Sequence, residues 1–164
     1  MITKRSFKML AIIHALVGSL IGEEFNSILL IMVISFSLHF VFDMFPHWDP
    51  KWDKKKFETT GEATLTKFAK AWVTVDHILA VLMILSLYTL FDSKKMALGA
   101  FMGILPDIIS LGYKTKLKKN KAFARFLKFH SKIQGHTNLK RSTITQLIIL
   151  LILASLFAIV YFLG

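Results

Sequence analysis

The stretch 142-STITQLIILLILASLFAIVYFLG-164 contains no charged residue over its 23 positions. A helix needs about 20 consecutive apolar residues to cross the hydrocarbon core of a bilayer. The stretch is therefore long enough to span a membrane, and a soluble domain of 164 residues has no need of such a segment. The sequence predicts an integral membrane protein.

The composition excludes most other classes of protein. Hydrophobic residues make up 54% of the chain, yet 21 Lys and Arg residues against 10 acidic residues give a net charge of +11. Nucleic-acid-binding domains are often this basic but rarely this apolar, and a disordered chain is not this apolar. The chain has no cysteine, so disulfides, thiolate metal sites and a cysteine nucleophile are excluded. Gly22-Glu23-Glu24 follows the first apolar stretch, so we expect no cleaved signal peptide.

Long stretches with little or no charge predict about five transmembrane helices, in an all-α bundle that forms a single membrane domain over 1–164. Their expected ranges are 9–22, 25–45, 71–91, 96–113 and 142–164. The first is short, about 21 Å at 1.5 Å per residue, so it needs snorkelling basic residues or a locally thinner bilayer.

The distribution of basic residues predicts the orientation of these helices. All but Lys94 and Lys95 of the 21 Lys and Arg residues lie in the N-terminal segment or in the connections 47–70 and 114–141. Five alternating helices place these three segments on one side, which the positive-inside rule assigns to the cytoplasm. We therefore expect a prokaryotic inner-membrane protein with a cytoplasmic N-terminus and an external C-terminus. Anionic lipid headgroups then account for the net charge, without nucleic acid.

Segment 122–134 differs from the rest of its basic connection. Its apolar and polar-aromatic residues fall on one face at helical spacing, among basic residues; that face comprises Phe123, Phe126, Leu127, His130 and Gln134. A basic amphipathic helix of this kind lies in the membrane interface. We expect His130 to face the bundle. The alternative is a solvated basic loop that touches lipid.

Besides His77, five His and Asp residues lie inside the predicted spans, where each ionisable group costs roughly 2.5–3.5 kcal/mol on insertion scales. They are His14, His39, Asp43, Asp76 and Asp107. His39 and Asp43 are four residues apart and share a helix face. At about 1.5 Å per residue, all five lie roughly 6–12 Å from the cytoplasmic end of their helices. Because the orientation came from Lys and Arg alone, this common depth is an independent observation.

Imidazole nitrogens and carboxylate oxygens together are typical ligands of Zn²⁺, Fe²⁺ or Mn²⁺. We therefore predict one or two divalent metal ions, with zinc the first choice, held by His14, His39, Asp43, Asp76 and Asp107. Candidates for further ligands or for general acid–base catalysis are His47, Asp49, His130 and His136. His77 neighbours Asp76 and points about 100° away from it around the helix, which favours a structural role. The alternative is a buried polar network that packs helices without a metal.

Two features of 96–113 bear on packing. Gly99, Ala100 and Gly103 are small enough to let this helix approach its neighbours closely, although they would also suit a lipid-facing surface. Pro106 removes a backbone hydrogen bond and kinks the helix next to Asp107. A short internal similarity indicates two similar helix pairs around the site. It relates Phe42-Asp43-Met44-Phe45-Pro46-His47 to Met102-Gly103-Ile104-Leu105-Pro106-Asp107.

Taken together, these motifs resemble a known family. They are His14-Ala-Leu-Val-Gly18, Leu38-His39-Phe-Val-Phe-Asp43-Met-Phe-Pro-His47-Trp-Asp49, Asp76, Gly99-Ala-Phe-Met-Gly103-Ile-Leu-Pro-Asp107, and Phe129-His130 with His136. The chain resembles the membrane-bound metal-dependent hydrolases (inner-membrane putative hydrolases) over roughly residues 10–136. The His-x3-Asp and Pro-Asp motifs carry the likeness, although in that group the Pro-Asp motif tends to come first. The resemblance implies a metal-dependent hydrolase of unspecified substrate.

The leading functional hypothesis is a hydrolase whose metal activates water at headgroup depth, acting on a phosphoester of a lipid or lipid-linked substrate. A transporter for a divalent cation or proton is one alternative, because intramembrane His and carboxylates also mark ion paths. A di-iron membrane oxidase or hydroxylase is another, although such sites usually contain more histidines. A structural or assembly protein with a polar core is the last.

Overall fold

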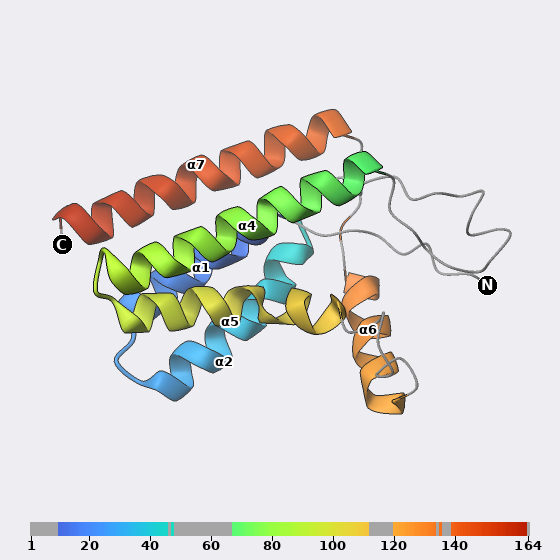
Figure 1. The fold of residues 1–164 in the computed structure, drawn as a ribbon, viewed down its shortest axis with the longest axis horizontal. Coiled ribbons are helices and arrows are strands. Elements are labelled where there is room, and N and C mark those ends of the chain that lie inside the picture. The colour runs from blue at the N-terminus through green and yellow to red at the C-terminus, as the bar shows by residue number, and fades with distance from the viewer. Residues whose placement is uncertain are drawn as a thin grey trace, which may run out of the picture.

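The computed structural model describes residues 10–45, 47, 67–111, 120–133, 135 and 139–163. Within these residues the regular secondary structure is entirely helical, which confirms the all-α prediction. The helices are α1 (Ala11–Glu24), α2 (Ile28–Asp43), α4 (Lys67–Thr89), α5 (Lys94–Leu111), α6 (Lys121–Ile133) and α7 (Leu139–Leu163), as Figure 1 shows. Their ends lie within about one helical turn of the ranges expected from the sequence.

Two helices, α4 and α7, are long and apolar enough to cross a membrane by length and composition. The other helices in the described residues fall short for different reasons. Helix α1 has 14 residues and α2, although apolar, has 16. Helix α5 has 18 residues but includes Lys94, Lys95 and Asp107. The described chain therefore contains two candidate spans, and the predicted number of five is not confirmed.

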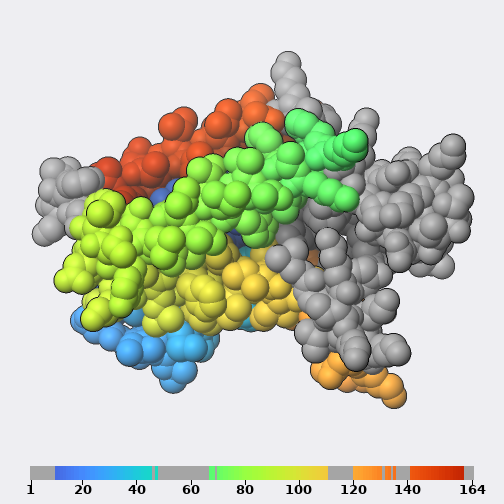
Figure 2. All heavy atoms as spheres, in the orientation of Figure 1, coloured from blue at the N-terminus to red at the C-terminus, as the bar shows by residue number. Residues whose placement is uncertain are grey.

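The outward faces of α4 and α7 are covered by large apolar side chains. Those more than a third exposed include Val75, Ile78, Leu79, Leu82 and Leu85 on α4, and Leu147, Ile148, Leu151, Ile152 and Leu156 on α7. Figure 2 shows α4 and α7 forming much of one face of the molecule. Apolar patches of this extent on a folded chain mark a protein or membrane contact. The exposed faces of both candidate spans are therefore suited to hydrocarbon.

Helix α1 lies at the centre of the bundle and contacts α2, α4, α5 and α7. One side of it places Ala11 and Ala15 against alanines and longer side chains of α4 and α5. Another side packs Ile13, Leu16 and Val17 near Leu153 of α7. Nine of its 14 residues are buried, including His14. The short first apolar stretch is therefore the core helix around which the others are arranged.

Facing glycines bring α1 and α5 into direct backbone contact. Gly18 on α1 meets Gly99 on α5, and a Cβ added to either glycine would overlap the backbone of the other helix. One turn away, a Cβ on Gly103 would overlap the carbonyl of His14. This confirms the prediction that small residues allow close approach at this helix. The crossing places His14 against the part of α5 that leads to Asp107.

Helix α6 runs across one end of the bundle rather than along it (Figure 1). Asn120 begins it, because its Oδ1 accepts hydrogen bonds from the amides of Ala122 at 2.9 Å and Phe123 at 3.2 Å. Phe40 of α2 holds it by ring contacts with Phe126 and Phe129, at centroid distances of 6.3 and 5.4 Å. The amphipathic helix expected at 122–134 is present, and its position at a membrane surface stays a prediction.

Candidate metal centre

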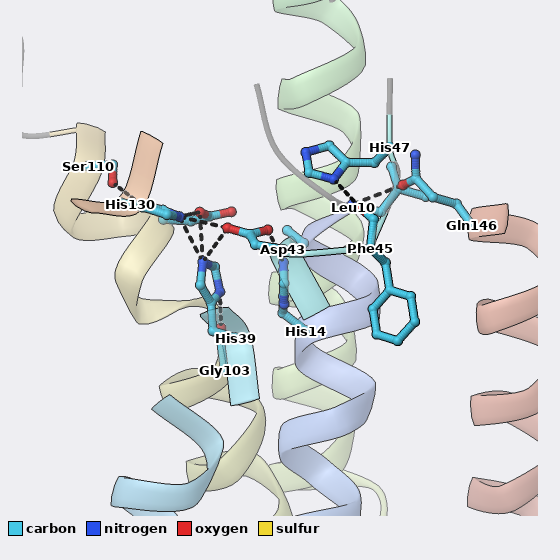
Figure 3. Close-up of polar contacts among 12 residues, drawn as sticks. Leu10, His14, His39, Asp43, Phe45, His47, Gly103, Ser110, His130 and Gln146 are labelled. Atoms are coloured by element: carbon cyan, nitrogen blue, oxygen red, sulfur yellow. Dashed lines mark hydrogen bonds and ion pairs between the residues drawn. The ribbon is translucent and has the colours of Figure 1, made fainter. Parts of the chain in front are cut away.

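Five ionisable side chains from four helices meet at one buried point. They are His14 of α1, His39 and Asp43 of α2, Asp107 of α5 and His130 of α6, each at most 2% exposed. They form two overlapping groups, His14 with His39 and Asp43, and His39 with Asp107 and His130. The ligand atoms of each group lie within 4.8 Å of one another. Figure 3 shows His39, Asp43 and His130 pointing toward one another, with His14 beside Asp43.

Four of the ligand atoms, two imidazole nitrogens and two carboxylate oxygens, lie 2.8–3.8 Å apart in the five pairs that involve a histidine. His39 Nε2 lies 3.1 Å from His130 Nε2, 3.3 Å from Asp43 Oδ2 and 3.4 Å from Asp107 Oδ1. His130 Nε2 lies 2.8 Å from Asp43 Oδ2 and 3.8 Å from Asp107 Oδ1. A tetrahedral ion with bonds of about 2.1 Å holds its ligand atoms about 3.4 Å apart. We call these four atoms the four-donor set.

Both histidines of the four-donor set are oriented by their other ring nitrogen. His39 Nδ1 lies 2.8 Å from the carbonyl oxygen of Gly103, which can only accept, so Nδ1 carries the proton. The Ser110 hydroxyl donates to the carbonyl of Pro106 at 2.9 Å and accepts from His130 Nδ1 at 2.9 Å. In a neutral ring, the form that binds a metal, the Nε2 lone pair would face the two carboxylates. Metal-binding histidines show this arrangement.

The charges of the cluster also fit a divalent cation. Asp43 and Asp107 are both fully buried, and burial of a carboxylate costs several kcal/mol unless an opposite charge compensates it. One divalent ion compensates two carboxylates. Two imidazole nitrogens and two carboxylate oxygens are a donor set that zinc, iron and manganese accept. The buried His and Asp residues can therefore hold a metal ion, whose identity the donor set leaves open.

His14 occupies the opposite side of Asp43 from the four-donor set. Its Nε2 lies 3.2 Å from Asp43 Oδ1, whereas the four-donor set uses Oδ2. Its ring stacks on His39 with centroids 4.0 Å apart and planes at 29°. Asp43 thus links His14 to the four-donor set through its two oxygens. A second ion, if present, would have His14 and Asp43 Oδ1 as ligands among the described residues.

Asp76, expected as a ligand, lies outside both groups and instead holds the start of α1. Its Oδ2 accepts a hydrogen bond from the amide of Ala11 at 2.6 Å, and its Oδ1 accepts from Ile12 at 3.2 Å. Gln146 of α7 accepts from the amide of Leu10 at 3.1 Å. The first amides of a helix have no partner within the helix, so these contacts satisfy them. We assign Asp76 to anchoring α1.

We expect Asp76→Ala to lower the free energy of unfolding by about 1–3 kcal/mol, because two amides at the start of α1 lose their acceptors. Metal content should be unchanged in the protein that stays folded. Thermal unfolding in detergent, beside elemental analysis, checks both. Asp76→Asn keeps one carbonyl acceptor and should fall between wild type and Asp76→Ala. Loss of metal from folded Asp76→Asn would show instead that Asp76 is a ligand.

The structure gives three different outcomes for the four candidate acid–base residues. His130 lies within the four-donor set, as one of its nitrogen donors. His47 is fully buried, with Nδ1 2.9 Å from the carbonyl of Phe45, and Figure 3 places its ring apart from the set. Asp49 and His136 lie outside the described residues. His77, expected to point away from Asp76, has Nδ1 2.8 Å from the carbonyl of Val73 in its own helix.

Several residues that support the site escaped the sequence analysis. Gly135 donates its amide to the carbonyl of Asp43 at 2.8 Å and accepts from the amide of His47 at 3.4 Å. This pairing joins the chain beyond α6 to the end of α2. A Cβ at Gly135 would crowd the carbonyl of Phe45, so glycine suits the close approach. Ser110 has a sequence signal, since it follows Asp107 by three residues and so shares its face.

We expect Ser110→Ala to weaken metal binding by about 10–100-fold, because His130 loses the acceptor that orients its ring. The fold should persist, since the side chain becomes only slightly smaller. Competition with a chelator measures the dissociation constant. Ser155→Ala, at an exposed position of α7, is the matched control and should bind as wild type does. Equal affinity of the two variants would mean that Ser110 does not position His130.

No protein-family model matches the sequence, and neither characterised proteins nor solved structures match it. The resemblance at residues 39–43 and 106–107 therefore stays a prediction.

Proposed function

We propose that the protein is a membrane-embedded metal-dependent hydrolase, acting on a phosphoester of a lipid or lipid-linked substrate near the cytoplasmic headgroup layer. The observation that carries the proposal is the four-donor set, in which two oriented imidazoles face two buried carboxylates. His130 Nε2 also lies 2.8 Å from Asp43 Oδ2, as in a hydrogen-bonded network, so the convergence of both rings on two carboxylates supports the metal. Here two Nε2 atoms lie 3.1 Å apart, which suits a shared cation.

The location follows from the expected topology. With α1, α2 and α5 as additional short spans, the positive-inside rule places the start of α1 and the end of α2 at the cytoplasmic surface. The helices of 14 and 16 residues are about 21 and 24 Å long, which a locally thinned bilayer can accommodate. The four-donor set then lies just below the headgroups, at a depth that a lipid phosphoester reaches.

The donor set supports hydrolysis in particular. When bound, a divalent ion of this class makes water a nucleophile at neutral pH and polarises a phosphoryl oxygen. Asp43, Asp107, His39 and His130 would hold the ion, and Gly103 and Ser110 would keep the two rings in place. His47, Asp49 and His136 remain candidates for moving a proton, because they are close in sequence to Asp43 and His130. The family resemblance of the His-x3-Asp and Pro-Asp motifs points to the same reaction class.

Metal content of the detergent-purified protein, by elemental analysis, is the first test. We expect one or two equivalents of zinc, manganese or iron, lost in the double variant His39→Ala, Asp43→Ala. The loaded protein is then assayed for phosphate release from phosphatidic acid and lipid-linked pyrophosphates. Absence of metal from both proteins, with unchanged folding, would refute the hydrolase and favour a packing network.

Other outcomes of the same preparation favour the alternatives. Two irons with a visible absorption band would favour the oxidase, and bound metal without hydrolysis, together with ion flux in proteoliposomes, would favour the transporter. In either case the four-donor set stands and the proposed reaction does not.

A further inference from the structure

One ligand of the four-donor set comes from outside the bundle. His130 is contributed by α6, and the packing of α6 on the other described helices is mainly on α2, through Phe40. By contrast, α1, α2 and α5 are held together by extensive mutual packing and by the glycine crossing. The completeness of the set therefore depends on how firmly α6 is held against α2.

Helix α6 has two distinct faces. The inner face holds His130, which is 2% exposed, and the partly buried Phe123, Phe126, Leu127 and Ile133. The outer face holds only basic ionisable residues: Lys121, Arg125, Lys128 and Lys132, all exposed. Their spacing of four, three and four residues aligns them in one stripe along the helix. No acidic residue occurs in α6, so nothing within the helix neutralises the stripe.

The stripe lies at the level where a headgroup layer would be. Figure 1 places α6 at the end of the bundle where the candidate spans α4 and α7 begin. Exposed basic residues also mark those helix ends, Lys67 and Lys70 on α4 and Arg141 on α7. Phe129, 51% exposed, adjoins the stripe, and an aromatic ring beside basic residues is typical of helices that lie in a membrane interface.

We propose that the outer face of α6 binds an anionic lipid surface, and that this binding completes the metal centre by holding His130 in place. The inference rests on the proposed metal site. Each Lys or Arg at an anionic surface strengthens binding to that surface by about fivefold. Four aligned residues therefore strongly favour the state in which α6 lies against α2. By linkage, the metal must in turn strengthen the attachment of α6 to the anionic surface.

The test compares metal affinity in two kinds of vesicle. The protein is reconstituted in pure phosphatidylcholine, or in roughly two parts phosphatidylcholine to one part phosphatidylglycerol. Chelator competition then gives the dissociation constant for zinc. We expect wild type to bind zinc about tenfold more tightly in the anionic vesicles. The double variant Arg125→Gln, Lys128→Gln should lose this enhancement and match wild type in neutral vesicles.

Matched controls distinguish lipid binding by α6 from a general effect of surface charge on zinc affinity. Lys67→Gln, Lys70→Gln removes the same charge from exposed positions at the same end of the bundle and should retain the enhancement. The chain has no cysteine, so Ala124→Cys on exposed α6 can carry a single spin label. Adding zinc should reduce the accessibility of this label to a water-soluble relaxant in anionic vesicles only.

The outcomes distinguish this inference from the proposed function. Equal zinc affinity in both vesicles, or an equal loss in the α4 control, would overturn the coupling while leaving the metal site intact. Failure of every preparation to bind zinc, manganese or iron would refute the metal site itself, and the coupling with it. If the α6 variant loses zinc affinity equally in both vesicles, the basic residues support the metal centre through contacts within the protein and not through lipid. That outcome also contradicts the inference.

Discussion

Asp43→Asn is expected to weaken metal binding by about a thousandfold, while the protein remains folded. Asp43 is the central residue of the cluster, since its Oδ2 lies 2.8 Å from His130 Nε2 and 3.3 Å from His39 Nε2. Asparagine has nearly the same shape but no charge, and its amide presents a weaker ligand. The buried site then holds one carboxylate where two are needed to compensate a divalent ion.

The measurement is metal content and chelator competition, with circular dichroism to follow folding. We expect the metal-free variant to be at least as stable as metal-free wild type, because a buried negative charge has been removed. Asp92→Asn is the control: Asp92 is exposed, lies in the turn between α4 and α5, and has φ 48°, a conformation that asparagine tolerates. Wild-type metal content in Asp43→Asn would contradict the four-donor set.

The sequence predicted the elements well because their signals are local. Uncharged runs and turn residues mark where helices begin and end, and α6 carried its amphipathic pattern over 13 residues. The i, i+4 pair His39 and Asp43 had to share a face, and the structure brings both into the cluster. Gly99 and Gly103, four residues apart, likewise had to share a face, which is the face that α1 uses.

The sequence could not predict which polar groups at the same depth would meet. Asp76 lies at a depth similar to that of His14, but depth along a helix gives no information about direction around it. Its carboxylate faces the first amides of α1, which are themselves strong donors. His130 was expected to face the bundle, but its place among the ligands depends on contacts with Phe40 and Ser110, which lie far from it in the chain.

The number of spans stays a prediction, because it depends on helix length and packing, and packing is not visible in the sequence. An uncharged run predicts a helix, but crossing a membrane depends on length and on what surrounds the helix. Helix α1 has 14 residues and is surrounded by α2, α4, α5 and α7, whereas α4 and α7 are long and expose apolar side chains. A short buried helix and a long exposed one give similar apolar patterns, so only packing separates them.

The central position of α1 means that the metal centre depends on the α1–α5 crossing. His14 lies four residues before Gly18, and Asp107 lies eight residues after Gly99, on the helices that these two glycines bring together. Helix α5 also supplies the Gly103 carbonyl that orients His39. Any change that separates α1 from α5 should therefore move ligands from both helices at once.

Gly99→Val should accordingly produce the largest loss of stability, about 3 kcal/mol or more, and should also lower metal content. Its Cβ would overlap the carbonyl of Gly18, a backbone atom that cannot move aside by changing rotamer, so the helices must separate. Ala154→Val, at an exposed position of α7, adds bulk away from the crossing and is the matched control. Unfolding in detergent and elemental analysis give the two readouts. Wild-type stability in Gly99→Val would mean that α1 and α5 are not in backbone contact, whereas lost stability with full metal content would show that the four-donor set forms without that crossing.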